Sequence, residues 1–134
     1  MQAQWQAVDV CCNFTFAMTI DDFSFHDSTI LEVRETTVDQ TLDFIINFPT
    51  NWVENKFERR VLRFFDVIYY CINEIPFAEQ PTILQIVNLG QIIKDFGSDT
   101  NPLKTVRNKI DMQTNSGSRL IEFSKCELLE LTNY

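Results

Sequence analysis

One tetrapeptide places three side chains that can do hydrolytic chemistry next to one another. In Phe25-His26-Asp27-Ser28 an imidazole, a carboxylate and a hydroxyl are consecutive, and His26 is the only histidine of the chain. Serine hydrolases use the same three groups, but they draw them from distant positions and hold the serine on a G-x-S-x-G turn, which is missing here. The spacing therefore predicts a structural role, in which Asp27 or Ser28 caps a turn and His26 forms a local hydrogen bond. A binding role is the first alternative and catalysis the second.

Acidic side chains offer another chemistry, because paired carboxylates hydrolyse glycosides and bind cations. The chain contains 19 acidic residues, but no pair is set apart by its surroundings, and Asp21-Asp22 is typical of a solvated turn. No segment has the alternating acids, central glycine and closing glutamate of a calcium loop. With only 3 glycines, the chain also lacks the glycine-rich loops of nucleotide-binding enzymes. We therefore predict no catalytic residue, no metal site and no cofactor.

The four cysteines, Cys11, Cys12, Cys71 and Cys126, do not have the spacing of metal ligands. A zinc site normally draws on closely spaced pairs such as C-x-x-C, and none occurs in this sequence. Cys11 and Cys12 are adjacent, so in a strand their side chains would point to opposite faces. We expect reduced thiols with structural roles.

Charge is distributed unevenly along the chain, whose formal net charge is −8. The first 33 residues hold five acidic residues and no Lys or Arg. An acidic protein repels phosphate backbones, so nucleic acid is not an expected partner, even for the aromatic and basic residues 59–70. A merely solvated polar face is the favoured interpretation of Asp9, Asp21 and Asp22. The alternative hypothesis is that they belong to a contact surface for a basic protein or for a second copy of the chain.

Length and hydrophobicity indicate a single domain over residues 1–134. Hydrophobic residues make up 45% of the chain, which also contains 12 Phe, so a core can form without metals or disulfides. No run approaches the roughly 18 consecutive apolar residues of a membrane-spanning helix, and the N-terminus lacks the features of a signal peptide. A cytoplasmic protein with no membrane partner is expected.

Alternation of apolar and polar residues with a period of two is the dominant pattern, and it predicts β-strands. The alternation runs without a break over residues 8–20 and recurs at 30–38 and at 42–48, with a hairpin loop between the last two segments. Pro49 is expected to end its strand, because proline lacks the backbone donor that a sheet requires. Residues 49–57 are then predicted to form a loop.

The secondary structure of the middle of the chain is less clearly indicated by its sequence. Residues 58–75 are rich in β-branched and aromatic side chains, which favour two strands or one strand bent at a bulge near Asp66. Residues 81–96 fit two structures. Pro81 suits the first turn of a helix and Gly97 its C-terminal cap, so a helix is slightly favoured, while alternation through the same residues allows a strand.

The C-terminal third predicts a hairpin. Residues 106–114 and 119–124 are its strands, and the turn between them contains Gly117, which can adopt a positive φ. Residues 126–131 form a final strand or a short helix. Together the segments predict a mostly-β fold, an antiparallel barrel or sandwich of about eight strands with at most one or two helices.

Two short motifs resemble those of uncharacterised small bacterial β-rich proteins of the immunity type. One is F-H-D-S at 25–28, directly before a strand, and the other is the hairpin T-N-S-G-S-R-L-I-E-F at 114–123. The resemblance covers residues 23–131 and does not include 8–20. Immunity proteins bind and neutralise a secreted toxin of the same or a neighbouring cell, so the resemblance implies a binding protein with no catalytic residues.

These patterns favour a non-enzymatic protein that binds another protein, with an immunity-like inhibitor of a bacterial toxin as the specific form. Acidity suits a basic toxin, since complementary charge speeds the encounter of two proteins. A β-barrel that holds a small molecule among inward-facing aromatic rings is one alternative, and a homo-oligomeric protein is another. A deep internal cavity would favour the ligand alternative, whereas a filled core with an exposed contact surface would favour protein binding.

Overall fold

The computed structural model describes residues 4–7, 20–76 and 79–133. These ranges form nine β-strands and one short 3₁₀ helix, and they contain no α-helix. In chain order the elements are β1 (Gln4–Ala7), η1 (Ile20–Asp22), β2 (Thr29–Thr36), β3 (Thr41–Asn51), β4 (Lys56–Phe65), β5 (Tyr69–Glu74), β6 (Ile83–Asp95), β7 (Lys104–Thr114), β8 (Gly117–Phe123) and β9 (Lys125–Asn133). No helix within these ranges has the length and apolar character needed to cross a membrane.

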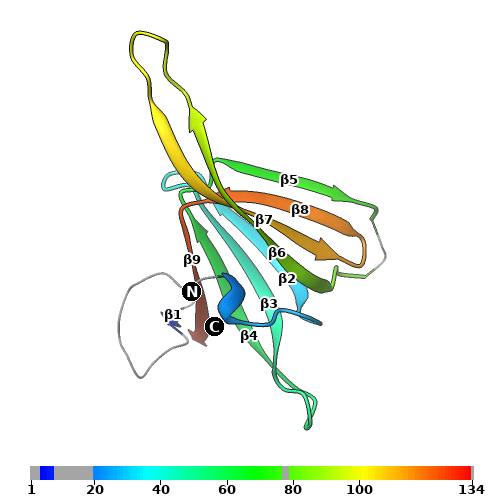
Figure 1. Cartoon of the computed structure of the whole chain (residues 1–134). Coiled ribbons are helices and arrows are strands. Elements are labelled where there is room, and N and C mark those ends of the chain that lie inside the picture. Colours follow the sequence, from blue (N-terminus) through cyan, green and yellow to red (C-terminus); the bar gives the residue numbers. More distant parts are fainter. Residues whose placement is uncertain (1–3, 8–19, 77–78, 134) are drawn as a thin grey trace.

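The strands are arranged in two antiparallel sheets (Figure 1). The larger sheet has the strand order β1-β9-β4-β3-β2, and the smaller has the order β5-β8-β7-β6. This architecture confirms the predicted mostly-β antiparallel fold. The two sheets are not joined into a closed barrel, so of the two predicted forms the sandwich is the correct one.

Inward-facing side chains from both sheets form one hydrophobic core. Strand alternation places every second residue on this inner face, and strands β3, β4 and β8 each contribute a Phe ring to it. The ring of Phe64 lies 5.7 Å from that of Phe44 and 4.7 Å from that of Phe123, and both contacts are edge-to-face. All three side chains are buried. Edge-to-face contact is favourable for aromatic rings, and these rings occupy the middle of the sandwich.

The helix slightly favoured for residues 81–96 is wrong, because this segment contains the long strand β6. Leu84 and Leu89 are the extra residues of two bulges, so they lie opposite no residue of β7. Each bulge shifts the apolar alternation by one position, and the shifted pattern imitates helical spacing. Gly90 follows the second bulge with a φ of 86°, a conformation that favours glycine.

The loop predicted at 49–57 is too long. Strand β3 continues to Asn51 and β4 begins at Lys56, so only residues 52–55 form the turn. Pro49 does not end its strand: it pairs with Phe57 next to a register shift, and a bulge is one of the places where a sheet tolerates proline. The turn is closed by the Asn51 side chain, whose Oδ1 accepts hydrogen bonds from the backbone N–H groups of residues 53 and 54.

Residues 58–75 form two strands, as one alternative predicted, rather than one strand bent at a bulge. The two strands belong to different sheets. Strand β4 ends at Phe65 in the larger sheet, and β5 begins at Tyr69 in the smaller one. Asp66 lies between them with a φ of 51°, and its Oδ2 accepts a 2.6 Å hydrogen bond from the Ser124 hydroxyl. The chain therefore crosses from one sheet to the other at Asp66.

The predicted C-terminal hairpin is confirmed, with β7 and β8 joined by residues 115–116. Residues 126–131 lie within strand β9, so the strand alternative was right for this segment. The long strand predicted at 8–20 lies outside the described residues except for Ile20, which begins η1 and is buried.

Candidate functional site

The F-H-D-S segment joins the two sheets just before β2. The Asp27 N–H donates to the carbonyl oxygen of Ile83 at 2.9 Å, and the Ile83 N–H donates to that of Ser28 at 2.7 Å. One step further, the Ile30 N–H donates to the carbonyl oxygen of Pro81 at 2.8 Å. This ladder fastens the start of β2, in the larger sheet, to the start of β6, in the smaller one. The segment thus has an evident structural role.

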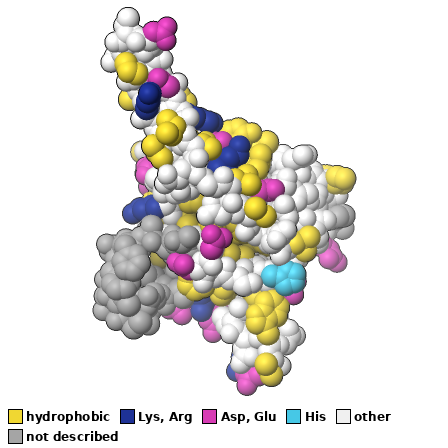
Figure 2. Space-filling view, in the orientation of Figure 1, with side chains coloured by type: hydrophobic (Ala, Val, Ile, Leu, Met, Phe, Trp, Pro, Cys, Tyr) yellow, Lys and Arg dark blue, Asp and Glu magenta, His cyan; other side chains and the backbone are white. Residues whose placement is uncertain are grey.

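The side chains of this segment do not form a catalytic triad. His26 Nδ1–H donates to the Leu84 carbonyl oxygen at 2.8 Å, the ring stacks on Trp52, and Nε2 lies 3.4 Å from an Asp27 carboxylate oxygen. His26, the one cyan side chain in Figure 2, lies on the surface. The Ser28 hydroxyl is completely buried and has no hydrogen-bond partner among the described residues. A substrate could not reach that hydroxyl without a rearrangement of the sheet junction.

The acidic contact surface hypothesised near the N-terminus is only partly described. Asp21 and Asp22 are exposed in η1, and an Asp21 carboxylate oxygen accepts a 3.3 Å hydrogen bond from the Asn88 side chain on β6. Asp9 lies outside the described residues. Within the described ranges, no group of three His, Cys, Asp or Glu side chains is placed to hold a metal ion.

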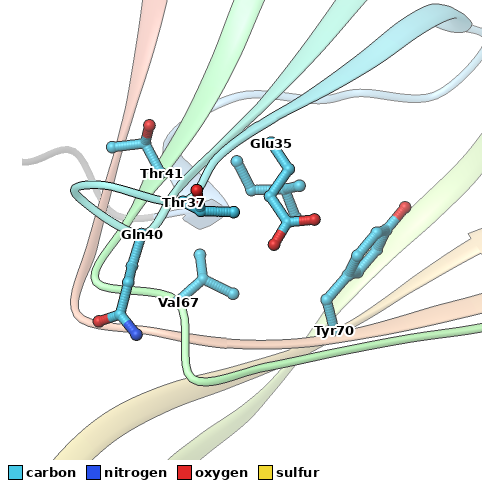
Figure 3. A pocket seen from close by; sticks show the side chains of 7 residues that line it. Glu35, Thr37, Gln40, Thr41, Val67 and Tyr70 are labelled. Atoms are coloured by element: carbon cyan, nitrogen blue, oxygen red, sulfur yellow. The ribbon is translucent and has the colours of Figure 1, made fainter.

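A pocket of about 200 Å³ opens between the β2–β3 turn and the start of β5 (Figure 3). The residues that line it come from both sheets and from the crossover between β4 and β5: Glu35, Thr37, Gln40, Thr41, Leu42, Val67 and Tyr70. Figure 3 shows the Glu35 side chain extending into the space between Val67 and Tyr70. One hydrogen bond, from the Val67 N–H to the Gln40 carbonyl oxygen at 3.0 Å, holds the two sides of the pocket together.

A buried ion pair lies behind the pocket on the inner face of the smaller sheet. Arg119 on β8 donates two hydrogen bonds to Glu74 on β5 and a third to the Tyr70 hydroxyl oxygen, at 2.8, 2.8 and 2.9 Å. The Arg119 guanidinium also lies 5.9 Å from the centre of the Phe44 ring, across the core. The Arg119 guanidinium therefore has partners within the protein, and the Glu74 carboxylate neutralises its positive charge.

The ionisation of these groups follows from their surroundings. Burial by itself would raise the pKa of Glu74, but the hydrogen bonds that it accepts from Arg119 and Thr114 outweigh burial and lower it. Burial raises the pKa of Tyr70, against the opposing effect of Arg119. Glu74 is thus held as a carboxylate and Tyr70 as a neutral phenol at neutral pH.

The Glu35 carboxylate is the remaining charge of the pocket. Glu35 is exposed, and it lies opposite Leu42 in the β2–β3 pairing, so its side chain is on the same face as that core residue but at the open rim of the sandwich. Within the described part of the chain this carboxylate forms no hydrogen bond and no ion pair. The pocket thus presents an unpaired negative charge beside an aromatic ring.

The distal part of the β6–β7 hairpin, residues 91–107, is a second candidate. This arm projects beyond both sheets, and its surface carries hydrophobic side chains (Figures 1 and 2). Ile93 and Val106 form a cross-strand pair and are 68% and 50% exposed. Phe96 and Leu103, joined by a backbone hydrogen bond of 2.8 Å beyond that pair, are 58% and 60% exposed. Clusters of exposed large apolar side chains are found at interaction sites, and here one pair lies on each face of the arm.

The tip of the arm is held in one conformation by its own hydrogen bonds. Asp95 Oδ1 accepts from the N–H groups of Gly97 and Leu103, both at 2.9 Å. Ser98 and Asn101 exchange two backbone hydrogen bonds across the loop, at 3.0 and 3.2 Å. The arm therefore presents Phe96 and Leu103 in a fixed arrangement. This reduces the conformational entropy that the arm loses when a partner binds.

No protein-family model, no curated protein and no solved structure matches this chain.

The pocket and the arm were not predicted from the sequence. The sequence contained only weak signals for the pocket. Glu35 is two positions from Val33, and Arg119 is two positions from Ile121, so in a strand each charged side chain lies on the same face as an apolar one. The arm had no local signal, because exposure depends on where the sheets end.

Proposed function

We propose that this protein acts in the cytoplasm by binding another protein rather than by catalysis, and that its specific role is an immunity-like inhibition of a bacterial toxin. The observation that carries the proposal is the projecting arm with its four exposed apolar side chains, Ile93, Phe96, Leu103 and Val106. The thiol of Cys71, which forms no disulfide, agrees with a reducing compartment.

The arm has the energetics of a binding element. A two-stranded ribbon is only marginally stable by itself, so large apolar side chains at its far end gain little from their own hairpin. Complete burial of such a side chain contributes about 1.5–3 kcal/mol, and each of these four has roughly half of its surface still to bury. A partner that covered the arm would gain about 1 kcal/mol from each side chain.

Charge favours a basic partner. The net charge of −8 attracts a positively charged protein over a distance set by the Debye length, which is about 8 Å at physiological salt. Asp21 and Asp22 in η1 contribute to that field from an exposed position. We expect these acids to affect the association rate and the arm to affect the dissociation rate.

Catalysis and small-molecule binding have less support. The Ser28 hydroxyl is buried, and His26 is engaged with Leu84 and Trp52. The pocket beside Glu35, at about 200 Å³, is smaller than the roughly 300–1,000 Å³ of typical ligand sites. A pocket of this size suits a single side chain better than a cofactor.

The adjacent gene supplies the test, because an immunity protein is expected to be encoded beside its toxin. The product of that gene is expressed alone and together with this protein, and cell growth is followed. Growth arrest by the neighbour alone and rescue by co-expression are expected. A harmless neighbour, or a toxic one that this protein does not neutralise, would reject the immunity role.

The arm is tested on the same pair with Phe96→Ser/Leu103→Ser. Isothermal titration calorimetry is expected to show affinity weakened by about 30-fold or more, since buried aromatic anchors dominate binding energy. Val53→Ser is the control, because Val53 is 96% exposed in the turn at the far end of β3 and should be neutral. Equal affinities for the two variants would contradict the role of the arm.

A second copy of the chain is the other possible occupant of the arm. Ile93–Val106 and Phe96–Leu103 are three positions apart along the ladder, so the two pairs lie on opposite faces and both faces are apolar. Analytical ultracentrifugation of the wild type and of Phe96→Ser/Leu103→Ser distinguishes a second copy of the chain from a toxin as the partner of the arm. A wild-type dimer that the double substitution converts to a monomer would favour self-association over the toxin.

A further inference from the structure

We propose that the pocket between the β2–β3 turn and β5 receives a lysine side chain of a partner protein. The ammonium group would pair with Glu35, while the alkyl stem would pack against Val67 and the ring of Tyr70. This inference deepens the proposed function, on which it rests, by naming the chemistry that one of its contact sites recognises.

The charge of the pocket selects a cation. Glu35 is the one lining residue that carries a charge, and its carboxylate has no hydrogen-bond or ion-pair partner in the described ranges. Arg119, which contacts the pocket residue Tyr70, is bound at both ends of its guanidinium, by Glu74 and by the Tyr70 hydroxyl. The unpaired negative charge therefore persists and makes an anionic ligand unfavourable.

The walls of the pocket suit a long aliphatic stem. Leu42, Val67 and Tyr70 supply apolar surface, and the volume of about 200 Å³ accommodates one side chain. Lysine buries its methylene groups along apolar surface while its ammonium group stays at a polar rim. The ring of Tyr70 adds a cation–π attraction for a cation placed over its face.

The pocket is already formed before any ligand enters. The hydroxyl of Tyr70 is held by Arg119, the Val67 N–H bonds the Gln40 carbonyl oxygen, and the Thr41 hydroxyl donates to Asp39 at 3.0 Å. Glu35 extends into this frame from the edge strand β2 (Figure 3). A preformed site binds with little loss of conformational entropy.

An inward-pointing charge on an edge strand has a second known use, which is to prevent sheets from pairing edge to edge. The two roles of Glu35 predict different results. A guard against aggregation affects solubility and self-association, but it gives no saturable binding of an amine. A lysine site gives saturable binding in a protein that remains a monomer.

The test uses the intact protein labelled with ¹⁵N and the probe N-acetyl-lysine N-methylamide. Saturable shifts of the Val67 and Tyr70 amide signals are expected on titration. N-acetyl-norleucine N-methylamide, which lacks the ammonium group, should give no saturable shift. Glu35→Gln should weaken binding of the lysine probe by about tenfold or more, since it removes a charge-assisted hydrogen bond.

Glu54→Gln is the matched control, because it removes the same charge at the opposite end of β3, where Glu54 pairs with Lys56 in an exposed position. It should leave the titration unchanged. Equal binding of the norleucine probe, or unchanged binding in Glu35→Gln, would overturn the proposal. Binding of 1,4-diaminobutane without binding of the lysine probe would assign the site to a free amine and would also overturn it.

These outcomes are independent of the arm. A partner that binds through Phe96 and Leu103 while the lysine probe fails would leave the proposed function intact and reject only the lysine site. A lysine probe that binds while the adjacent gene product does not would support the site and reject the immunity role.

Discussion

Arg119 and Glu74 face each other from neighbouring inner-face positions on β8 and β5, and two parallel hydrogen bonds of 2.8 Å join them. Each side chain is only 9% exposed. Gly117 is paired directly with Glu74, and its lack of a side chain lets β5 approach β8 closely at this point. The ion pair therefore fixes the position of the edge strand β5, which also carries Tyr70 at the pocket.

Glu74→Gln should destabilise the protein by about 3 kcal/mol at neutral pH, because it leaves the buried Arg119 without its counter-charge. The pKa of Glu74 is lowered on folding, so its contribution is complete above its ordinary value, 4.5, and is lost as pH falls through the lower folded value. Urea unfolding of both proteins, measured from pH 7 downwards, should show the difference shrinking below that pH. A difference that grew on acidification would contradict the ion pair.

Glu32→Gln is the control for that experiment. Glu32 also pairs with an arginine, Arg34, but the two side chains are half exposed. Exposed pairs contribute little, so this variant should unfold at the same urea concentration as the wild type.

Gly117→Ala should be strongly destabilising. A Cβ at this position would lie 2.1 Å from the backbone oxygen of Asn73, and φ is 149°. The clash involves backbone, so β5 and β8 must separate, and a loss of more than about 2 kcal/mol is expected. Gly90→Ala is the matched control: its φ is 86° but no atom lies within 4 Å, so only about 1 kcal/mol of backbone strain is expected. Equal melting temperatures for the two variants would show that β5 can move away from β8 without loss of stability.

His26→Ala should reduce stability by about 0.5–1.5 kcal/mol, the usual net value of one hydrogen bond, through loss of the contact with the Leu84 carbonyl. His26→Asn keeps a donor near the position of Nδ1 and should recover part of the loss. Thermal unfolding provides the measurement. A His26→Ala protein of unchanged stability that no longer neutralised its partner would assign His26 to the binding surface instead.

Ser28→Ala should leave stability unchanged or raise it by up to about 1 kcal/mol. The Ser28 hydroxyl is fully buried without a partner in the described ranges, and an unsatisfied buried polar group is costly. Denaturant unfolding checks the change, and the backbone ladder to β6 should be unaffected. A loss of more than about 1 kcal/mol would show that the hydroxyl has a hydrogen-bond partner in solution.

Cys126 should resist alkylation in the folded protein. Burial raises the pKa of this thiol to about 12, so almost no thiolate is present at neutral pH. Cys71, which is partly exposed on β5, should be labelled by iodoacetamide much faster. Peptide mass spectrometry after timed labelling distinguishes the two positions. Equal labelling rates without denaturant would mean that β9 opens readily.

Local patterns in the sequence were sufficient for much of the fold. Alternation of apolar and polar residues depends only on the pleat of a strand, so it predicted β2, β3, β7 and β8 and the mostly-β class, and it left β9 as a strand or a short helix. The turn before Gly117 was also readable, because a positive φ is a property of one residue. The predicted side-chain cap by Asp27 or Ser28 and the local hydrogen bond of His26 are not what the structure shows, because Asp27 uses its backbone N–H to bond Ile83 and His26 bonds the distant Leu84.

The errors in β6 and at Pro49 have causes that lie outside the segments themselves. The bulges at Leu84 and Leu89 interrupted the alternation in β6, and a bulge is visible only when the partner strand is known. Pro49 was tolerated inside β3 because a register shift lies beside it. In both places the outcome depended on the neighbouring strand rather than on the segment itself.

The tertiary structure alone decided which surfaces exist. Glu35 and Tyr70 are 35 positions apart in sequence, and they share a pocket because the chain changes sheets at Asp66. Nothing in the sequence around Phe96 and Leu103 indicates exposure, and they are exposed because β6 and β7 extend past the sheet that faces them. Strand patterns report which face of a strand is apolar, whereas packing between distant strands determines whether that face meets a core, a pocket or solvent.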